Sequence, residues 1–232
     1  MSEPNVTVVT RKRTNVKNMT SMAMLTALAY VVMLLSKTLP QVSGFLQMDL
    51  KDTIICIGGF VFGPLSAAII SIVVAVVEMF TYSDTGIIGC IMNVLATVSF
   101  CCTASFVYKK LHTRKGAIIG LALGVAALTI VMLLWNYLIT PIYMKIPRDV
   151  VASMLPTVFL PFNLAKGGLN MAVILLLYKP VVTALRQAKL LPESTRTSGA
   201  SADKKLNAGF LLFSLALLAT FATLTLVLMG II

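Results

Sequence analysis

The chain has 232 residues, of which 58% are hydrophobic and only 12% are charged, whereas soluble domains average about 25% charged residues. This composition, with apolar runs long enough to cross a bilayer, excludes an ordinary soluble protein and predicts an all-α, multi-pass membrane protein. The net charge of +11 does not indicate nucleic-acid binding, because the basic residues lie in short loops between apolar runs, which is the positive-inside pattern.

A basic arm, residues 1–18, opens the chain. Because its residues are mostly polar and no clear small-residue cleavage site follows the first apolar run, we expect a retained first helix and not a signal peptide. Gly63 and Pro64 divide one apolar stretch into two, since proline lacks an amide donor and favours a helix start. The expected spans cover residues 19–36, 53–62, 65–80, 87–108, 117–140, part of 154–178, and 206–232.

The connections between these spans alternate in charge. Lysine and arginine number four in the N-terminal arm, four in residues 109–115 and six in residues 179–205, which gives fourteen. The connections on the other side hold four: Lys37, Lys51, Lys145 and Arg148. Because positively charged loops stay in the cytoplasm, we expect a cytoplasmic N-terminus and, with seven spans, an external C-terminus.

Familiar catalytic motifs are missing from the sequence. It contains no GxxxxGK(S/T), HExxH or GxSxG pattern, so the chain is predicted to be neither a P-loop ATPase nor another enzyme, and no metal or cofactor is expected. The four cysteines lie in apolar segments without a CxxC pair, which argues against metal and disulfide roles. None of the eight acidic residues sits clearly at the middle of a span, so a proton-coupled carrier has no obvious relay.

Amides, hydroxyls and one cation remain inside the predicted spans. Helical spacing places them on shared faces: Asn163, Lys166 and Asn170; Thr129, Asn136 and Thr140; Asn93 and Thr97. Such groups tend to face the bundle interior or a cavity, because they are costly in hydrocarbon. Several amides with one lysine and no balancing acid favour a cavity for a small molecule that is uncharged or mildly anionic. The alternative is that each asparagine only bonds a neighbouring helix.

The depth of Lys166 decides how its charge is satisfied. If its helix begins near Pro161, the lysine lies about one turn inside and snorkels to water. If the helix begins near Leu155, the lysine lies about 16 Å along it and needs a partner. Gly167 and Gly168 come next and would let a neighbouring helix or a ligand approach closely, since they carry no Cβ.

Small residues form a seam on the first span, with Ala23 and Ala27 one turn apart. Seams of this kind let another helix approach closely. Two interpretations stay open: packing within the same bundle, and docking to another membrane subunit.

Three stretches resemble one family of membrane proteins: "FLQMDLKDTIICIGGFVFGPLSAAI", "WNYLITPIYMKIP" and "PFNLAKGGLN". They are similar to the riboflavin-specific S components, of the RibU type, of energy-coupling factor (ECF) transporters, over about residues 19–187. The resemblance implies a six-helix S-component bundle. This chain adds a polar linker, residues 188–205, and an additional C-terminal transmembrane helix, residues 206–232.

What the resemblance implies about function is a substrate-binding subunit of an ATP-driven vitamin importer in the cell membrane. Riboflavin, as transported substrate and not as cofactor, would enter from outside beneath the first loop and reach the cytoplasm with the help of a T component and two ATPases. The implied ligand contacts are Asn136, Asn163 and Lys166, joined by Phe45, Leu46, Asp49, Asn93 and Thr140. Ala23 and Ala27 match the family's docking surface.

Two other functions stay open on the sequence: an S component for another vitamin, and a secondary carrier or facilitator that works alone. Uptake by the chain alone in vesicles without an ATPase would indicate the carrier.

Overall fold

The computed structural model describes residues 7–82, 85–187 and 208–231. Over these residues the chain is helical, apart from turns and one β-bridge between Val42 and Leu46. The helices are α1 (Thr7–Ser36), α2 (Lys51–Phe62), α3 (Pro64–Thr81), α4 (Gly86–Leu111), α5 (Arg114–Met144), α6 (Arg148–Met154), the π-helical turn η1 (Leu155–Phe159), α7 (Leu160–Gln187) and α8 (Ala208–Leu228).

Six helical segments in the described part of the chain are long and apolar enough to cross a bilayer. They are α1 from Val16 onward, α3, α4, α5, the continuous run from α6 into α7, and α8. The 12 residues of α2 rise only about 18 Å, less than the ~30 Å of a hydrocarbon core. Residues 51–60 of α2 are all buried, so the surrounding helices enclose this short span. The all-α membrane fold expected from the sequence is confirmed.

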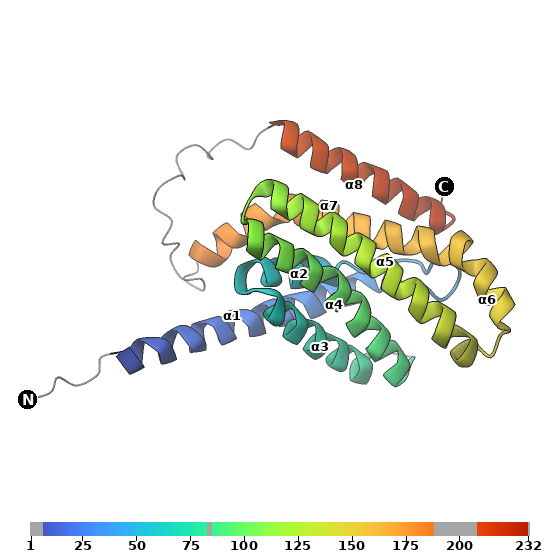
Figure 1. Cartoon of the computed structure of the whole chain (residues 1–232), viewed down its shortest axis with the longest axis horizontal. Coiled ribbons are helices and arrows are strands. Elements are labelled where there is room, and N and C mark those ends of the chain that lie inside the picture. The colour runs from blue at the N-terminus through green and yellow to red at the C-terminus, as the bar shows by residue number, and fades with distance from the viewer. Residues whose placement is uncertain (1–6, 83–84, 188–207, 232) are drawn as a thin grey trace, which may run out of the picture.

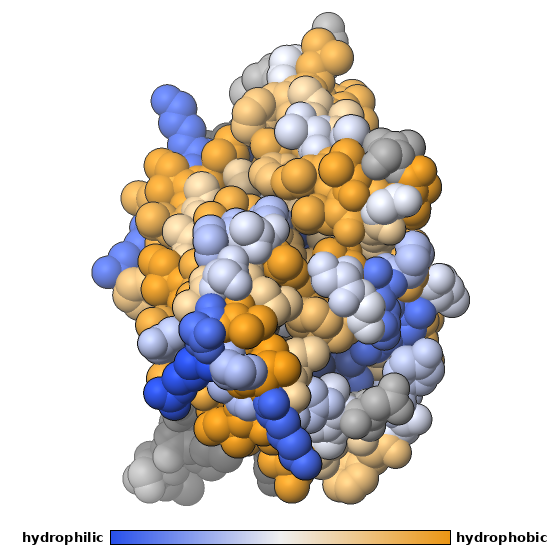
Figure 2. Space-filling view, turned by 90° about the vertical axis from the view of Figure 1, so that its right-hand side faces the viewer, coloured by the Kyte–Doolittle hydropathy of each residue, from blue (hydrophilic) through white to orange (hydrophobic). Residues whose placement is uncertain are grey.

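The bundle has two distinct ends in Figure 1. The basic end holds the turn between α4 and α5 (residues 109–115), the end of α7 and the start of α8; the α6 end holds α6 and the C-terminus. On the outside of the bundle, α8 lies antiparallel along α7. Figure 2 views the molecule from the α6 end, where hydrophilic side chains gather among apolar ones.

Local sequence explains the sharp corner that returns the chain from α2 into α3. Gly63 has φ of 101°, in the region that glycine tolerates because it has no Cβ. Pro64 is the first residue of α3, where its missing amide hydrogen leaves no helical bond unmade. The break expected at this pair is therefore a tight turn between two helices.

The sixth span is longer than the sequence suggested, because α6, η1 and α7 form one continuous run from Arg148 to Gln187. The two starts expected from the sequence, near Leu155 and near Pro161, both lie after the observed start at Arg148. Pro156 lies within η1, where a wider π-helical turn accommodates a residue without an amide hydrogen. Lys166 consequently lies near the middle of the helical run and not one turn from its beginning.

The loop between α1 and α2 packs against the sixth span through a small apolar core, named here the loop cluster. Val42, Leu46 and Met48 of the loop contact Phe159 and Phe162 of the sixth span. A larger core joins α1–α5 and α7. The loop cluster therefore fixes the first loop beside the buried polar face of α7.

Candidate ligand-binding site

Lys166 is buried on α7 with only 7% of the residue exposed. Its Nζ donates a hydrogen bond to Asp49 Oδ2 at 2.8 Å, in the loop just before α2. The expectation that this lysine has no balancing acid is therefore wrong, and so is the snorkelling alternative. A buried ammonium is stable only beside an opposite charge with good hydrogen-bond geometry, and Asp49 supplies both.

Asp49 and Lys166 belong to a larger group of buried or half-buried charges, named here the charge network. Its members are Lys37, Asp49, Lys51, Asp52, Glu78 and Lys166. Glu78 on α3 accepts hydrogen bonds from Lys51 Nζ at 2.7 Å and pairs with Lys37 Nζ at 3.0 Å. Lys51 Nζ also lies 3.8 Å from Asp49 Oδ2. Because three lysines face three carboxyl groups, the network carries little net charge.

Two carboxylate oxygens of the network have no hydrogen-bond partner among the described residues: Asp49 Oδ1 and Asp52 Oδ2. A buried acceptor without a donor costs about 1–3 kcal/mol, so a ligand donor would be favourable there. Burial raises the pKa of the Asp49 carboxyl, but Lys166 and Lys51 outweigh that effect and hold the pKa at about 2. Asp49 is therefore an ionised acceptor at neutral pH.

Asn170 fixes the first loop to α7 one turn beyond Lys166. Its Nδ2 donates to the backbone oxygen of Asp49 at 2.9 Å, and its Oδ1 accepts from Thr53 Oγ1 on α2 at 2.8 Å. This residue shares the face of Lys166, as the spacing predicted, and its bonds hold Asp49 in register with the lysine.

The remaining amides of α5 and α7 are buried but bond mainly within their own helices. Asn136 Nδ2 donates to Met132 O at 2.7 Å, and Asn136 Oδ1 accepts from Thr140 Oγ1 at 3.0 Å. Asn163 Nδ2 donates to Phe159 O at 2.7 Å. Asn136 and Asn163 thus lie on inward faces of neighbouring helices, and a ligand acceptor can replace the backbone oxygen to which each amide nitrogen donates.

The first loop supplies apolar contacts beside these amides. Leu46 is 8% exposed and belongs to the loop cluster. The Phe45 ring meets the Phe159 ring edge-on, with centroids 6.0 Å apart. Phe45 and Leu46 therefore lie beside Phe159 at the end of η1, one helical turn before Asn163.

Asn93 on α4 contacts the charge network. Its Nδ2 donates to Glu78 Oε2 at 3.1 Å. Since Lys51 joins Glu78 to the vicinity of Asp49, Asn93 is connected to the site through two intervening side chains.

The charge network contains residues that the sequence reading misjudged. Glu78 lies in the last turn of α3, not at the middle of the span, but it is only 2% exposed, and the sequence did not predict its partners. Lys37 and Lys51, counted as loop charges, are paired with it. A signal was present in the single acid of the run "IVVAVVEMF", because an ionisable residue within a span normally has a partner.

Ala23 and Ala27 lie on the outward face of α1. Both are exposed, whereas Leu25 and Ala29 face the core. These two alanines therefore do not pack inside their own bundle, and their small side chains leave a shallow surface for another helix.

Comparisons with a family model, with known relatives and with solved structures agree. The model of the family "ECF transporter, substrate-specific component" matches residues 17–182. The riboflavin transporter FmnP of Bacillus subtilis (strain 168) is 30% identical over 187 residues, or 75% of this chain and 98% of the relative. The riboflavin transporter RibU of Staphylococcus aureus (strain TCH60) is 29% identical over 178 residues, or 74% of this chain and 93% of the relative.

A solved structure of the S component of a bacterial ECF transporter has the same arrangement of helices. It superimposes with a TM-score of 0.64 at 27% identity and covers 74% of this chain and 99% of that one. The matched family region ends at residue 182, so α8 lies outside it.

Proposed function

The chain belongs to the family of substrate-specific components of ECF transporters, and from this premise we propose that it binds riboflavin from the external side and delivers it to the cytoplasm together with a T component and two ATPases. The relatives named riboflavin transporters support the choice of vitamin. The buried pairing of Lys166 with Asp49 beneath the first loop is the structural observation that carries the proposal.

Riboflavin matches this environment in charge and in polarity. It is uncharged at neutral pH, flat and amphipathic, so its rings suit apolar walls such as Phe45 and Leu46. Its ribityl hydroxyls and ring imide both donate and accept hydrogen bonds. The proposed contacts are donors from Asn136, Asn163 and Lys166, and an acceptor in the unpartnered oxygen of Asp49. A few convergent polar groups on apolar walls are the usual form of a small-molecule site.

The low net charge of the network favours an uncharged ligand over an anionic one. An anion entering a site in which each lysine already faces a carboxylate would meet repulsion as well as attraction. An S component for a different uncharged vitamin is the second candidate, because the bonds of Asn136 and Asn163 fix no particular ligand. A stand-alone carrier is the third, and it predicts uptake by the chain alone.

The direct experiment is purification of the full chain in detergent followed by an absorbance spectrum and a titration of riboflavin fluorescence. We expect a flavin spectrum in the purified protein and quenching of riboflavin fluorescence at a stoichiometry of one. If a well-folded protein neither quenches riboflavin fluorescence nor carries a flavin absorbance band, riboflavin is excluded as the ligand. Thiamine and biotin, added as competitors, should leave the quenching unchanged.

Docking to the T component is proposed for the outward face of α1 around Ala23 and Ala27. Ala27→Trp should prevent co-purification with the T component and the ATPases, because close approach of helices needs small side chains. Riboflavin binding should be unaffected, since Ala27 is exposed. Leu65→Trp, on a residue of α3 that is 75% exposed, is the matched control. Recovery of the whole complex with Ala27→Trp would refute this assignment.

A further inference from the structure

Asp52 is a buried carboxyl group to which the proposed ligand contacts assign no role. It lies in the first turn of α2 and is 1% exposed. Thr97 Oγ1 of α4 donates to its Oδ1 at 2.6 Å, whereas its Oδ2 has no hydrogen-bond partner among the described residues. Because a buried acceptor without a donor is costly, a donor that reaches this oxygen would be bound favourably.

Asp52 differs from the other two carboxyl groups of the charge network in its ion pairs. Within the described part of the chain, each salt bridge of the network ends on Asp49 or Glu78. The Asp52 carboxyl lies within electrostatic range of Lys51 and Lys166, but both lysines have a nearer carboxylate. The charge of Asp52 is therefore the least compensated of the three, and its free oxygen gains more from a donor than that of Asp49 does.

The backbone around Asp52 is bonded to the face of α7 that carries the proposed ligand contacts. Asn170 Nδ2 donates to the backbone oxygen of Asp49, and Thr53, the residue after Asp52, donates to Asn170 Oδ1. Asn170 lies one helical turn beyond Lys166 on the same face. The start of α2 is thus fixed beside the proposed riboflavin site.

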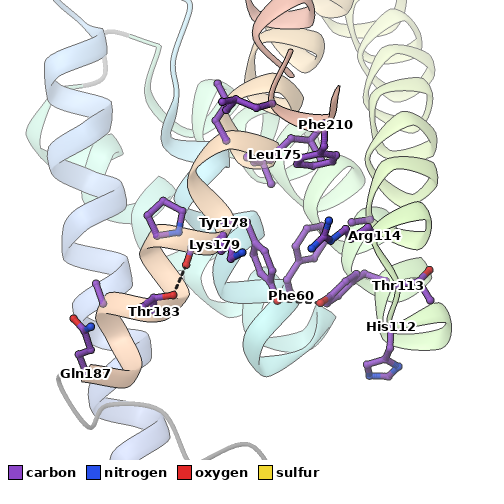
Figure 3. Close-up of a pocket in the computed structure, with 17 residues that line it drawn as sticks. Phe60, His112, Thr113, Arg114, Leu175, Tyr178, Lys179, Thr183, Gln187 and Phe210 are labelled. Carbon is purple, nitrogen blue, oxygen red and sulfur yellow. Dashed lines mark hydrogen bonds between the residues drawn. The ribbon is translucent and has the colours of Figure 1, made fainter. Parts of the chain in front are cut away.

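The large cavity at the basic end of the bundle does not account for the free oxygen of Asp52. Figure 3 shows this cavity, which has a volume of about 960 Å³, with Phe60 of α2 among the residues around it. Phe60 follows Asp52 by about 12 Å along the helix, and Asp52 does not line the cavity. The oxygen belongs to the opposite end of α2, where the charge network lies.

Riboflavin carries one group that matches such an acceptor. The imide N–H, between two ring carbonyls, is the only N–H of the neutral ring system, and it donates without accepting. A carboxylate accepts without donating, so this pairing satisfies both groups and leaves the two carbonyls to the amide and ammonium donors of the site. We propose, on the basis of the proposed function, that Asp52 Oδ2 accepts from the imide N–H and makes Asp52 a specificity-determining residue.

The test compares riboflavin with N3-methylriboflavin, in which a methyl group replaces the imide hydrogen, by fluorescence titration of the full chain in detergent. We expect the wild type to bind the methylated flavin about tenfold to a hundredfold more weakly, because the buried carboxylate loses its donor. Asp52→Asn keeps an acceptor for Thr97 but turns an amide donor toward the imide. It should weaken riboflavin binding by a similar factor and remove the preference. Asp149→Asn, the same change at an exposed residue, should leave both unchanged.

A second variant, Asp52→Ala, makes room for the methyl group and should bind the two flavins equally. The ratio of the two affinities is measured within each protein, so a general loss of stability, followed by thermal melts, does not alter it. The inference is overturned if the wild type binds both flavins equally, or if either variant at Asp52 keeps the wild-type preference, even where its riboflavin binding is weaker. A folded wild type that binds neither flavin would instead refute the proposed function, and this inference with it.

Discussion

Lys166 depends on one carboxylate that a distant part of the chain provides. Removal of one partner from a buried ion pair costs about 3–5 kcal/mol, because the other charge is left in a site of low dielectric. Removal of both partners avoids that cost. The pair therefore allows the stability effect of Lys166 to be separated from its role in binding.

We expect Lys166→Met to lower the melting temperature and to weaken riboflavin binding by roughly tenfold to a hundredfold, since a charge-assisted bond to the ligand is lost. Lys166→Met combined with Asp49→Asn should regain much of the thermal stability while binding stays weak. Thermal unfolding and titration of riboflavin fluorescence measure the two effects. Exposed Lys145→Met is the control. Binding as tight as wild type in the single variant would contradict the proposed contact.

Glu78 holds the other end of the charge network. It pairs with Lys51 and Lys37 and accepts from Asn93, so Glu78→Gln leaves buried Lys51 without its nearest carboxylate. We expect a drop of several degrees in the melting temperature, as for the loss of about 3 kcal/mol from a buried pair. Asp149→Asn makes the same chemical change at an exposed site and should have little effect. Equal melting temperatures for the two variants would show that Glu78 adds no stability.

For single residues, the sequence predicted the position on a helix better than the interaction partner. Helical spacing correctly placed Lys166 and Asn170 on one buried face, because a period of 3.6 residues is a local property. It did not predict Asp49 as the partner of Lys166, since 117 positions separate them and only the folded bundle brings them together. The assignment of Asn136 and Asn163 to the ligand stays a prediction.

The contact between α7 and α8 depends on a missing side chain. A Cβ at Gly168 would overlap the ring of Phe221, whereas Gly167 faces Val125 and Leu128 of α5. The sequence left open whether a helix or a ligand approaches this glycine pair. The structure shows a neighbouring helix at each glycine. The Phe221 ring of α8 thus occupies the space that a Cβ at Gly168 would fill, and this lets α8 pack closely on α7.

Gly168→Ala should therefore loosen α8 and lower the melting temperature by a few degrees, in line with the roughly 1–3 kcal/mol that overpacking costs. Phe221→Leu in the same chain should recover part of the loss by making room for the new methyl group. Gly209→Ala places a Cβ where no atom lies within 4 Å and serves as the control. If Gly168→Ala melts with the wild type, the close approach is not tight in solution.

The elements were predictable in number and type, and less so in their ends. Apolar runs and the Gly63–Pro64 pair marked the helices because length and proline chemistry act locally. The sixth span was expected to begin near Leu155 or Pro161, whereas the helical run begins at Arg148 and contains Pro156 in a π-helical turn and Pro161 in the first turn of α7. Proline is compatible with helix where its missing donor is not needed.

The orientation of the whole molecule is proposed from its charges. Lys37 and Lys51 pair inside the protein, so Lys145 and Arg148 are left as the exposed basic residues of the α6 end, against the strongly basic opposite end. Because excess positive charge stays inside, a reporter fused after Lys205 should read as cytoplasmic and one fused after Ile232 as external. Alkaline phosphatase and a fluorescent protein at both positions make the measurement. The reverse pattern would invert the assignment.

Deletion of residues 200–232 tests whether α8 belongs to the binding unit. The matched family region ends at residue 182, so we expect the truncated chain to bind riboflavin. We also expect a lower melting temperature, because Phe221 and its neighbours no longer cover α7. Fluorescence titration and a thermal melt of the truncated protein measure both. Loss of binding in a folded truncation would make α8 part of the site.

The long separation between Asp49 and Lys166 has a consequence for biosynthesis. The ribosome must complete α3, α4, α5 and the first part of α7 before the carboxylate meets its ammonium. Until then Asp49 and Asp52 stand at the entrance of a short helix that cannot span the bilayer by itself. We expect nascent chains that stop before Lys166 to expose these charges to the translocon and to membrane proteases. Incomplete chains would then be degraded in preference to complete ones.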